Sequence, residues 1–210
     1  MSAVIESSTR VFGWGERGCL DEQEKLPVND GSVLVTGKMR TFTVEECNEI
    51  IQSVQGVYEG DAITSDGGTS FSTESRITKM KTIYPNSEFD WFFDKIEDLV
   101  KQVAPQFDID VTGFYEGAQV YDYPEGGFLD WHMDIGKGIM SDRKLSISIQ
   151  LSDGDSYDGG NLEFLDTKSQ APRVQGASVV FSSYRMHRVS PVTRGHRKSI
   201  VTWVHGRPFR

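Results

Sequence analysis

A histidine and an aspartate two residues apart, His132 and Asp134, constrain the fold of this chain more than any other feature of its sequence. Side chains at positions i and i+2 of a β-strand point to the same face, so the pair can reach one metal ion while Met133 points away. A third ligand from a distant strand would complete two imidazoles and one carboxylate, the facial set that leaves open positions on Fe(II). His187 is the candidate. The sequence therefore predicts a mononuclear iron site built on β-strands.

A His-X-Asp pair alone is weak evidence, because a surface histidine beside an acidic residue gives the same pattern. The downstream His187, followed by Arg197 in a strand-like segment, makes the iron site the favoured interpretation. The other two histidines, His196 and His205, are expected at the surface or at a strand edge. Either of them could replace His187 as a ligand only with a different strand geometry.

Arg197 falls on the same face of the predicted strand 197–203 as Trp203, which indicates a partly buried anion site. Iron held by two neutral imidazoles and one carboxylate keeps a net positive charge, so a dianion such as 2-oxoglutarate can chelate it through its keto acid end. The far carboxylate then requires a cation, and a guanidinium gives planar bidentate pairing and stays protonated when desolvated. Tyr123, which precedes His132 on the preceding strand segment, could donate a phenolic hydrogen bond into the same cavity.

The composition indicates one folded domain spanning residues 1–210. A chain of 210 residues can bury one sizeable core, and 37% hydrophobic with 25% charged residues is typical of a globular protein rather than a disordered one. The net charge of −9 argues against a protein that grips phosphate backbones, because nonspecific nucleic-acid affinity comes from clustered lysines and arginines. We therefore expect no nucleic-acid partner.

The cysteine content favours a reducing compartment. Only Cys19 and Cys47 are present, without paired-cysteine metal spacing, and no N-terminal apolar segment resembles a signal peptide or a membrane span. We expect a cytoplasmic location, no membrane partner, and reduced thiols that pack or lie at the surface. A disulfide is the disfavoured alternative, because intracellular thiols are normally kept reduced.

The N-terminal part of the chain divides into three segments. Residues 1–40 lack sustained periodicity, apart from a strand-like run at 32–35, and form an extension to which the sequence assigns no role. Thr43 and Glu46 have the form of a capping box, and an apolar stripe after them predicts a helix. Residues 60–75 are rich in Gly, Ser, Thr and Asp, which predicts a surface loop that is either a linker or a substrate lid.

A second helix and a series of short strands are expected next. Asn86 and Ser87 can cap the helix, and its largely aromatic stripe, which begins at Phe89, is expected in the core until Pro105 stops it. From about residue 108, short strands separated by Gly, Pro, Asp and Ser are typical of an antiparallel sandwich or barrel, with the two helices covering one sheet.

Alternation along the predicted strand 144–151 gives that sheet two different faces. Leucine and isoleucine occupy every second position and form an apolar face, which is expected to pack. Ser146, Ser148 and Gln150 form the other face, which is expected to meet water or a ligand.

Four segments of the second half resemble a known family. They read YPEGGFLDWHMD at 123–134, RKLSISIQLS at 143–152, YDGGNLEF at 157–164 and HRVSPVTRGHR at 187–197. From about Phe114 to Arg210 the chain resembles the Fe(II)- and 2-oxoglutarate-dependent dioxygenases of the prolyl-hydroxylase type, especially the PKHD-type hydroxylases. The resemblance implies a mainly β fold with flanking helices, in which residues 108–210 form a double-stranded β-helix, or jelly roll.

The resemblance also implies a site and a reaction. The residues it assigns are His132, Asp134 and His187 on iron, Arg197 on the C5 carboxylate of 2-oxoglutarate, Tyr123 as a cosubstrate contact, and Gln150 and Trp203 along the same pocket. The implied reaction consumes O2 and 2-oxoglutarate and releases succinate and CO2, with ascorbate as a candidate reductant.

Several departures from related enzymes limit what can be carried over. Collagen-type prolyl hydroxylases usually have lysine where this chain has Arg197, and a second tyrosine where it has Leu129. Nucleic-acid demethylases of the superfamily usually have a second arginine where this chain has Trp203, and halogenating relatives lack the carboxylate that Asp134 retains.

The favoured hypothesis is therefore a hydroxylase of a prolyl or other residue in a peptide or protein. Hydroxylation of a free amino acid or another small metabolite is the alternative within the superfamily. Outside it, the alternatives are a non-catalytic, cupin-like binding protein and a structural protein in which the motifs merely pack. The sequence does not predict an oligomeric state.

Overall fold

The computed structural model describes residues 34–35, 40–55, 65–66, 69–70, 76–85, 88–107, 109–166 and 170–208. All of them lie within one compact unit, Gly31–Arg210. The predicted extension 1–40 falls outside the described residues except for Leu34, Val35 and Arg40, and one domain for the whole chain stays a prediction.

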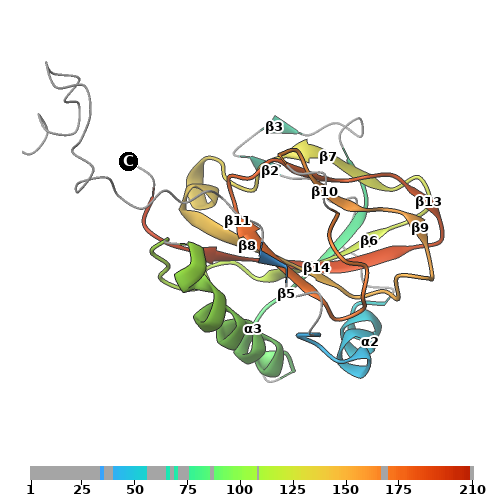
Figure 1. Ribbon diagram of the computed structural model, residues 1–210, viewed down its shortest axis with the longest axis horizontal. Helices are drawn as coiled ribbons and strands as arrows, with labels where there is room; N and C mark the ends of the chain where they lie inside the picture. The colour runs from blue at the N-terminus through green and yellow to red at the C-terminus, as the bar shows by residue number, and fades with distance from the viewer. Residues whose placement is uncertain are drawn as a thin grey trace, which may run out of the picture. The chain divides into compact units, whose positions relative to one another are not determined.

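Two antiparallel sheets form the frame of the protein and face each other (Figure 1). The larger sheet has the strand order β1 (Leu34–Val35), β11 (Ser178–Ser182), β8 (Arg143–Gln150), β14 (Arg197–His205), β6 (Ala118–Tyr123), β5 (Lys79–Ile83). The smaller sheet has the order β10 (Leu162–Phe164), β12 (His187–Val189), β7 (Phe128–His132), β4 (Arg76–Ile77). Two short pairs join β13 (Val192–Arg194) to β9 (Asp158–Gly159), and β2 (Ser65–Asp66) to β3 (Thr69–Ser70). This is the jelly roll predicted from the sequence.

The larger sheet has the two different faces predicted from alternation. Leu145, Ile147 and Ile149 of β8 belong to the core cluster that also contains the helices. Ser146 and Gln150 point to the opposite face, toward the smaller sheet. All eight residues of β8 are buried, so the polar face is enclosed rather than open to water. Because buried hydroxyl and amide groups cost free energy unless they are paired, this face must be satisfied by protein or ligand.

The helix α2 (Val44–Ser53) begins at the capping box predicted from the sequence. The Thr43 hydroxyl accepts a hydrogen bond from the Glu46 backbone N–H at 3.1 Å, and the Glu46 carboxylate accepts one from the Thr43 N–H at 2.8 Å. Cys47 and Ile50 then bury the apolar stripe against the larger sheet. Glu46 also receives Lys95 of the next helix, at 2.5 Å, which joins the two helices.

The second helix, α3 (Asp90–Val103), packs beside α2 on the same face of the larger sheet (Figure 1). It follows Phe89, which makes no side-chain cap, and the predicted cap at Asn86 and Ser87 lies outside the described residues. The α-helix ends before Pro105, as predicted, and continues as the 3-10 helix η2 (Ala104–Phe107). A second 3-10 helix, η3 (Gly138–Asp142), precedes β8. Among the described residues, no helix is long and apolar enough to span a bilayer.

Two further predictions fall partly on the described residues. Cys47 is a buried free thiol, and burial raises its pKa to about 12, so it packs as an inert side chain. Cys19 lies outside the described residues. Of the loop predicted at 60–75, the described part is the β2–β3 pair, and its role as linker or lid stays a prediction.

We expect Phe92→Ala to lower the free energy of unfolding by about 3–5 kcal/mol. Phe92 is fully buried between the helices and the larger sheet, and its ring stacks on Phe42 at 5.4 Å. Urea denaturation gives the measurement, with Tyr84→Ala as control because Tyr84 is 62% exposed. Equal midpoints for the two variants would contradict the packing described here.

Candidate metal centre

Three side chains converge between the sheets at the end of β7. His132 is the last residue of β7 and His187 is the first of β12, and the two are direct partners across the antiparallel ladder. Their ring centroids lie 4.2 Å apart. With Asp134, they bring one ligand atom each to within 4.8 Å of one another. The structure thus brings together the three residues predicted as metal ligands.

A β-bulge supports this convergence. β12 advances two residues from His187 to Val189, while β7 moves three residues from His132 to Leu129, so β7 carries an extra residue. Bulges re-aim side chains and break the strict alternation of a strand. As a result, Leu129 packs into the interior although it lies an odd number of residues from His132.

Asp134 is positioned differently from the sequence prediction. β7 ends at His132, so the carboxylate lies beyond the strand instead of on its inner face. The Asp134 backbone N–H donates to the carbonyl of Ser183 at 2.9 Å, and its Oδ2 accepts a hydrogen bond from the Ser146 hydroxyl at 2.6 Å. Met133 is 47% exposed, so it does point away as predicted. Contacts to Ser146 of β8 and to Ser183, in the turn that follows β11, therefore replace strand geometry in aiming the carboxylate.

Both imidazoles are fixed in the tautomer that suits a metal ion. Nδ1 of His132 lies 2.8 Å from the carbonyl of Asp130, and Nδ1 of His187 lies 2.9 Å from the carbonyl of Arg185. A carbonyl can only accept, so each Nδ1 carries the proton and each Nε2 keeps a free lone pair. These Nε2 atoms lie 3.6 and 3.7 Å from the Asp134 oxygens. Two imidazole nitrogens and one carboxylate fit a ferrous ion with open positions.

Burial and charge set the protonation states that metal binding requires. Burial lowers the pKa of His187 to about 4, so this imidazole is neutral at pH 7. Burial alone would raise the pKa of Asp134, but His187, His132 and the Ser146 hydroxyl together hold it below its ordinary value. A neutral imidazole beside an ionised carboxylate can take up a divalent cation without first losing a proton.

A second layer of residues behind the metal cluster is not apparent from the sequence motifs. The Arg143 Nη1 donates to the backbone carbonyl of Asp134 at 3.1 Å, and its guanidinium lies 3.7 Å from the ring centroid of Trp203. Nε and Nη2 of Arg143 pair with the two carboxylate oxygens of Glu116. Burial would raise the pKa of Glu116, but hydrogen bonds from Arg143 and His205 lower it to about 2.

The expected surface position is wrong for His205, which is fully buried. Its Nδ1 accepts the backbone N–H of Tyr115 at 3.3 Å, so Nε2 carries the proton and donates to Glu116 at 2.9 Å. Both ring nitrogens of His205 therefore have hydrogen-bond partners within the protein in place of water. His196 is exposed as predicted and contacts Asp122.

Arg197 lies on the inner face of the larger sheet and is only 4% exposed. It is the ladder partner of Tyr123, and its guanidinium lies 5.4 Å from the Tyr123 ring centroid. It donates to the Ser199 hydroxyl at 3.2 Å, and no carboxylate of the described residues lies within ion-pair distance. Gly160, at φ 59°, lies so close that a Cβ there would approach the Arg197 side chain to 3.1 Å. A buried cation without a protein counter-ion suits an anionic ligand.

The three other predicted pocket residues lie on the same inner face. Burial raises the pKa of Tyr123 to about 12, which keeps the phenol protonated as a donor. The charge of Arg197 lowers this pKa and that of Asp134 raises it, and burial outweighs both. Gln150 lies opposite Ser199. Its amide donates to the Ser152 carbonyl at 2.9 Å.

Trp203 lies at the metal end of this face. It is the ladder partner of Ser146, the residue whose hydroxyl donates to Asp134. Its indole Nε1 is buried without an acceptor. Trp203 therefore belongs to the surroundings of the metal cluster, whereas Gln150 belongs to those of Arg197.

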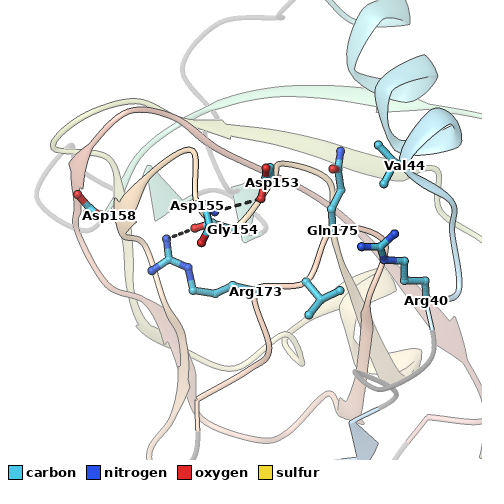
Figure 2. A pocket seen from close by; sticks show the side chains of 9 residues that line it. Arg40, Val44, Asp153, Gly154, Asp155, Asp158, Arg173 and Gln175 are labelled. Carbon is cyan, nitrogen blue, oxygen red and sulfur yellow. Dashed lines mark hydrogen bonds between the residues drawn. The ribbon is translucent and has the colours of Figure 1, made fainter.

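A separate hollow contains none of the predicted site residues (Figure 2). Its lining includes Arg40, Asp153, Asp155, Asp158 and Arg173. Figure 2 shows two hydrogen bonds among its lining residues: the Arg173 guanidinium donates to the Gly154 carbonyl at 2.7 Å, and Asp153 accepts the Asp155 N–H at 3.1 Å. These groups of the hollow already pair within the protein, unlike the three metal-ligand side chains that converge between the sheets.

Comparison with known sequences supports the resemblance inferred from the motifs. Residues 118–205 match the 2OG-Fe(II) oxygenase superfamily. This oxygenase segment contains every predicted site residue. Similar proteins include PKHD-type hydroxylases of Teredinibacter turnerae, 38% identical over 90 residues, and of Maricaulis maris, 38% identical over 86 residues. The alignments cover 39% of this chain and 39% and 38% of those relatives, so the chain spans about two fifths of their length.

Solved structures share the jelly-roll fold. A Pseudomonas putida prolyl-4-hydroxylase superposes with a TM-score of 0.64 at 20% identity, over 85% of this chain and 94% of the other. A Trichoplax adhaerens prolyl hydroxylase, in complex with a peptide fragment of hypoxia inducible factor, gives 0.67 at 16% identity, over 84% of each chain. These likenesses confirm the predicted fold class.

We expect Ser146→Ala to weaken metal binding by about 10–100-fold, because the hydroxyl that orients the Asp134 carboxylate is lost. Anaerobic titration with Fe(II), or with Zn(II) as a stable substitute, gives the dissociation constant. Ser148→Ala is the matched control, since Ser148 lies on the same face of β8 and Asp134 accepts no hydrogen bond from it. Equal affinities for the two variants would rule out this role for Ser146.

Proposed function

We propose that this protein is an Fe(II)- and 2-oxoglutarate-dependent dioxygenase that hydroxylates a C–H bond. The observation that carries the proposal is the cluster of His132, Asp134 and His187, in the same interior as Arg197, which is buried and pairs with no carboxylate of the described part of the chain. The cluster suits a divalent cation, and the arginine suits the distant carboxylate of a dianionic cosubstrate. The superfamily match of residues 118–205 supports the same reaction class.

Each residue has a defined task in this proposal. Bound iron would supply the activation of O2 that couples loss of CO2 from 2-oxoglutarate to hydroxylation, with one oxygen atom entering the substrate and the other entering succinate. The two Nε2 atoms and the Asp134 carboxylate hold the ion. Arg197 pairs with the C5 carboxylate of 2-oxoglutarate, and the protonated phenol of Tyr123 donates a hydrogen bond to the same cosubstrate.

Aromatic and aliphatic side chains shield the His187 side of the metal cluster from water, while His132 stays partly exposed. Phe181 packs edge-on against His187 at 4.7 Å, and Phe164 lies 6.2 Å from the same ring. Val189 and Val192 close the interior near Tyr123. Exclusion of water strengthens the electrostatic contacts to the cosubstrate and limits side reactions.

For the substrate, we propose a prolyl or other residue of a peptide or protein. The names of the similar proteins support this choice, since they are PKHD-type hydroxylases and prolyl hydroxylases, one of them solved with a bound peptide. A free amino acid or small metabolite is the second candidate, and the buried arginine described in the next subsection favours an acidic molecule. Ascorbate is the proposed reductant, and the cytoplasm the proposed location.

A turnover assay tests the reaction class directly. With Fe(II), ascorbate and O2, we expect the protein to convert 2-oxoglutarate to succinate, and a chelator to abolish the reaction because the proposed chemistry requires the bound ion. Asp134→Ala should remove this turnover, whereas His196→Ala, at an exposed histidine, should retain it. Absence of succinate formation would favour a cupin-like binding protein, and succinate formation without metal would contradict the proposed iron site.

We expect Arg197→Ala to raise the KM for 2-oxoglutarate by at least about tenfold, because a charge-assisted, bidentate contact is lost. Arg197→Lys should recover part of the loss, since it restores the charge but not the planar fork. Arg194→Ala is the matched control three residues away, where the side chain is 60% exposed and pairs with Asp158. An unchanged KM in Arg197→Ala would remove Arg197 from the cosubstrate site.

A further inference from the structure

Arg76 is a second buried arginine with unused hydrogen-bonding capacity. It is 7% exposed, and two of its guanidinium nitrogens, Nε and Nη2, are shielded from solvent without a hydrogen-bond partner among the described residues. Its guanidinium carbon lies 5.0 Å from the ring centroid of Tyr121. Burying N–H groups of a cation without acceptors costs free energy, so the arrangement indicates a site that a ligand completes.

The two unpaired nitrogens identify the chemistry of that ligand. Nε–H and one N–H of Nη2 point in parallel along one edge of the guanidinium, the edge that matches the two oxygens of a carboxylate. Arg143 in this same chain shows the pairing, because its Nε and Nη2 donate to the two oxygens of Glu116. No carboxylate of the described residues occupies the corresponding edge of Arg76.

The strand pairing directs Arg76 toward the metal cluster. β4 is hydrogen-bonded to β7, the strand that ends at His132, and Arg76 is the partner of Leu129. Leu129 packs against the buried cluster that contains Tyr121 and Val189, so Arg76 faces the interior that also holds the metal cluster. Arg197 lies on β14 of the other sheet, so the two arginines reach the interior from different sheets.

We propose that Arg76 binds a carboxylate group of the primary substrate through Nε and Nη2. This inference rests on the proposed function, which assigns the two carboxylates of 2-oxoglutarate to the metal and to Arg197. The substrate class is then an organic acid, either a free amino or imino acid or a peptide that presents a terminal or side-chain carboxylate. An uncharged peptide segment leaves Arg76 unpaired and is disfavoured.

The first test measures binding without turnover. With Zn(II) in place of iron and 2-oxoglutarate at saturation, acetate and L-proline are titrated beside acetamide and L-prolinamide, and binding is followed by ligand-observed NMR. We expect both acids to bind at least about tenfold more tightly than their amides, because only a carboxylate fills the bidentate edge. Arg76→Met should remove the preference. An equal response to acids and amides in the wild type overturns the proposal.

Two further variants separate the role of Arg76 from a loss of folding. Arg76→Lys keeps the charge but lacks the parallel N–H groups, so we expect an intermediate preference. Arg188→Met is the matched control, because Arg188 pairs with Glu163 and lies against Trp131. Acid preference should persist in Arg188→Met. Its persistence in both Arg76 variants overturns the proposal.

The second test distinguishes the source of the carboxylate. Succinate formation and product mass are measured with L-proline, L-prolinamide, and proline-containing peptides with free or amidated C-termini. Stimulation by L-proline alone identifies a free acid, and stimulation by the free-terminus peptide identifies a peptide carboxylate. We expect Arg76→Met to lose at least about tenfold in kcat/KM for the acid and less for its amide.

The outcomes for the two proposals are separable. Succinate formation with equal use of acids and amides keeps the proposed function and overturns the assignment of Arg76. Acid binding that depends on Arg76, without any succinate formation, keeps the carboxylate site and overturns the oxygenase function. If no compound in the panel stimulates turnover, the NMR comparison of acid and amide binding decides whether Arg76 binds a carboxylate.

Discussion

The pairing of β12 with β7 is the interaction on which the rest of the site depends. Antiparallel hydrogen bonding places His187 directly opposite His132, at a separation set by the backbone rather than by the side chains. Backbone carbonyls then fix both rings by accepting from Nδ1. Asp134 needs no strand of its own, because Ser146 of the opposite sheet and Ser183, just beyond β11, hold it against this pair.

The larger sheet separates stability from chemistry by using its two faces differently. Its apolar face packs on α2 and α3, and that burial supplies most of the core. Its inner face carries hydroxyls, an amide and a guanidinium, which would cost stability if they were left unpaired. Several of them pair with one another, as the hydroxyls of Ser146 and Ser183 do at 3.0 Å. The groups left over, on Arg197 and Trp203, mark where ligands are expected.

Local patterns in the sequence predicted the alternation of β8, the capping box of α2 and the three clustered ligands. They failed where a strand carries an extra residue, because a bulge depends on the partner strand. Between Val204 and His205 the register of β14 with β8 shifts, so strict alternation does not describe the side chain of Arg143. His205 was expected at the surface or at a strand edge, whereas it is buried by contacts with Glu116, which lies 89 residues away in the sequence. Arg76 belongs to no motif, and only its burial identifies it.

The single residue between β4 and β5, Thr78, joins the smaller sheet to the larger one. Its hydroxyl donates to the backbone carbonyl of Asp122 on β6 at 2.8 Å, so the join is anchored as well as short. The sheets therefore have little freedom to slide past each other. Arg76 and Arg197, one on each sheet, are thereby held at a set spacing, so in the proposed function the substrate carboxylate and the C5 carboxylate of 2-oxoglutarate are bound in a fixed relation to each other.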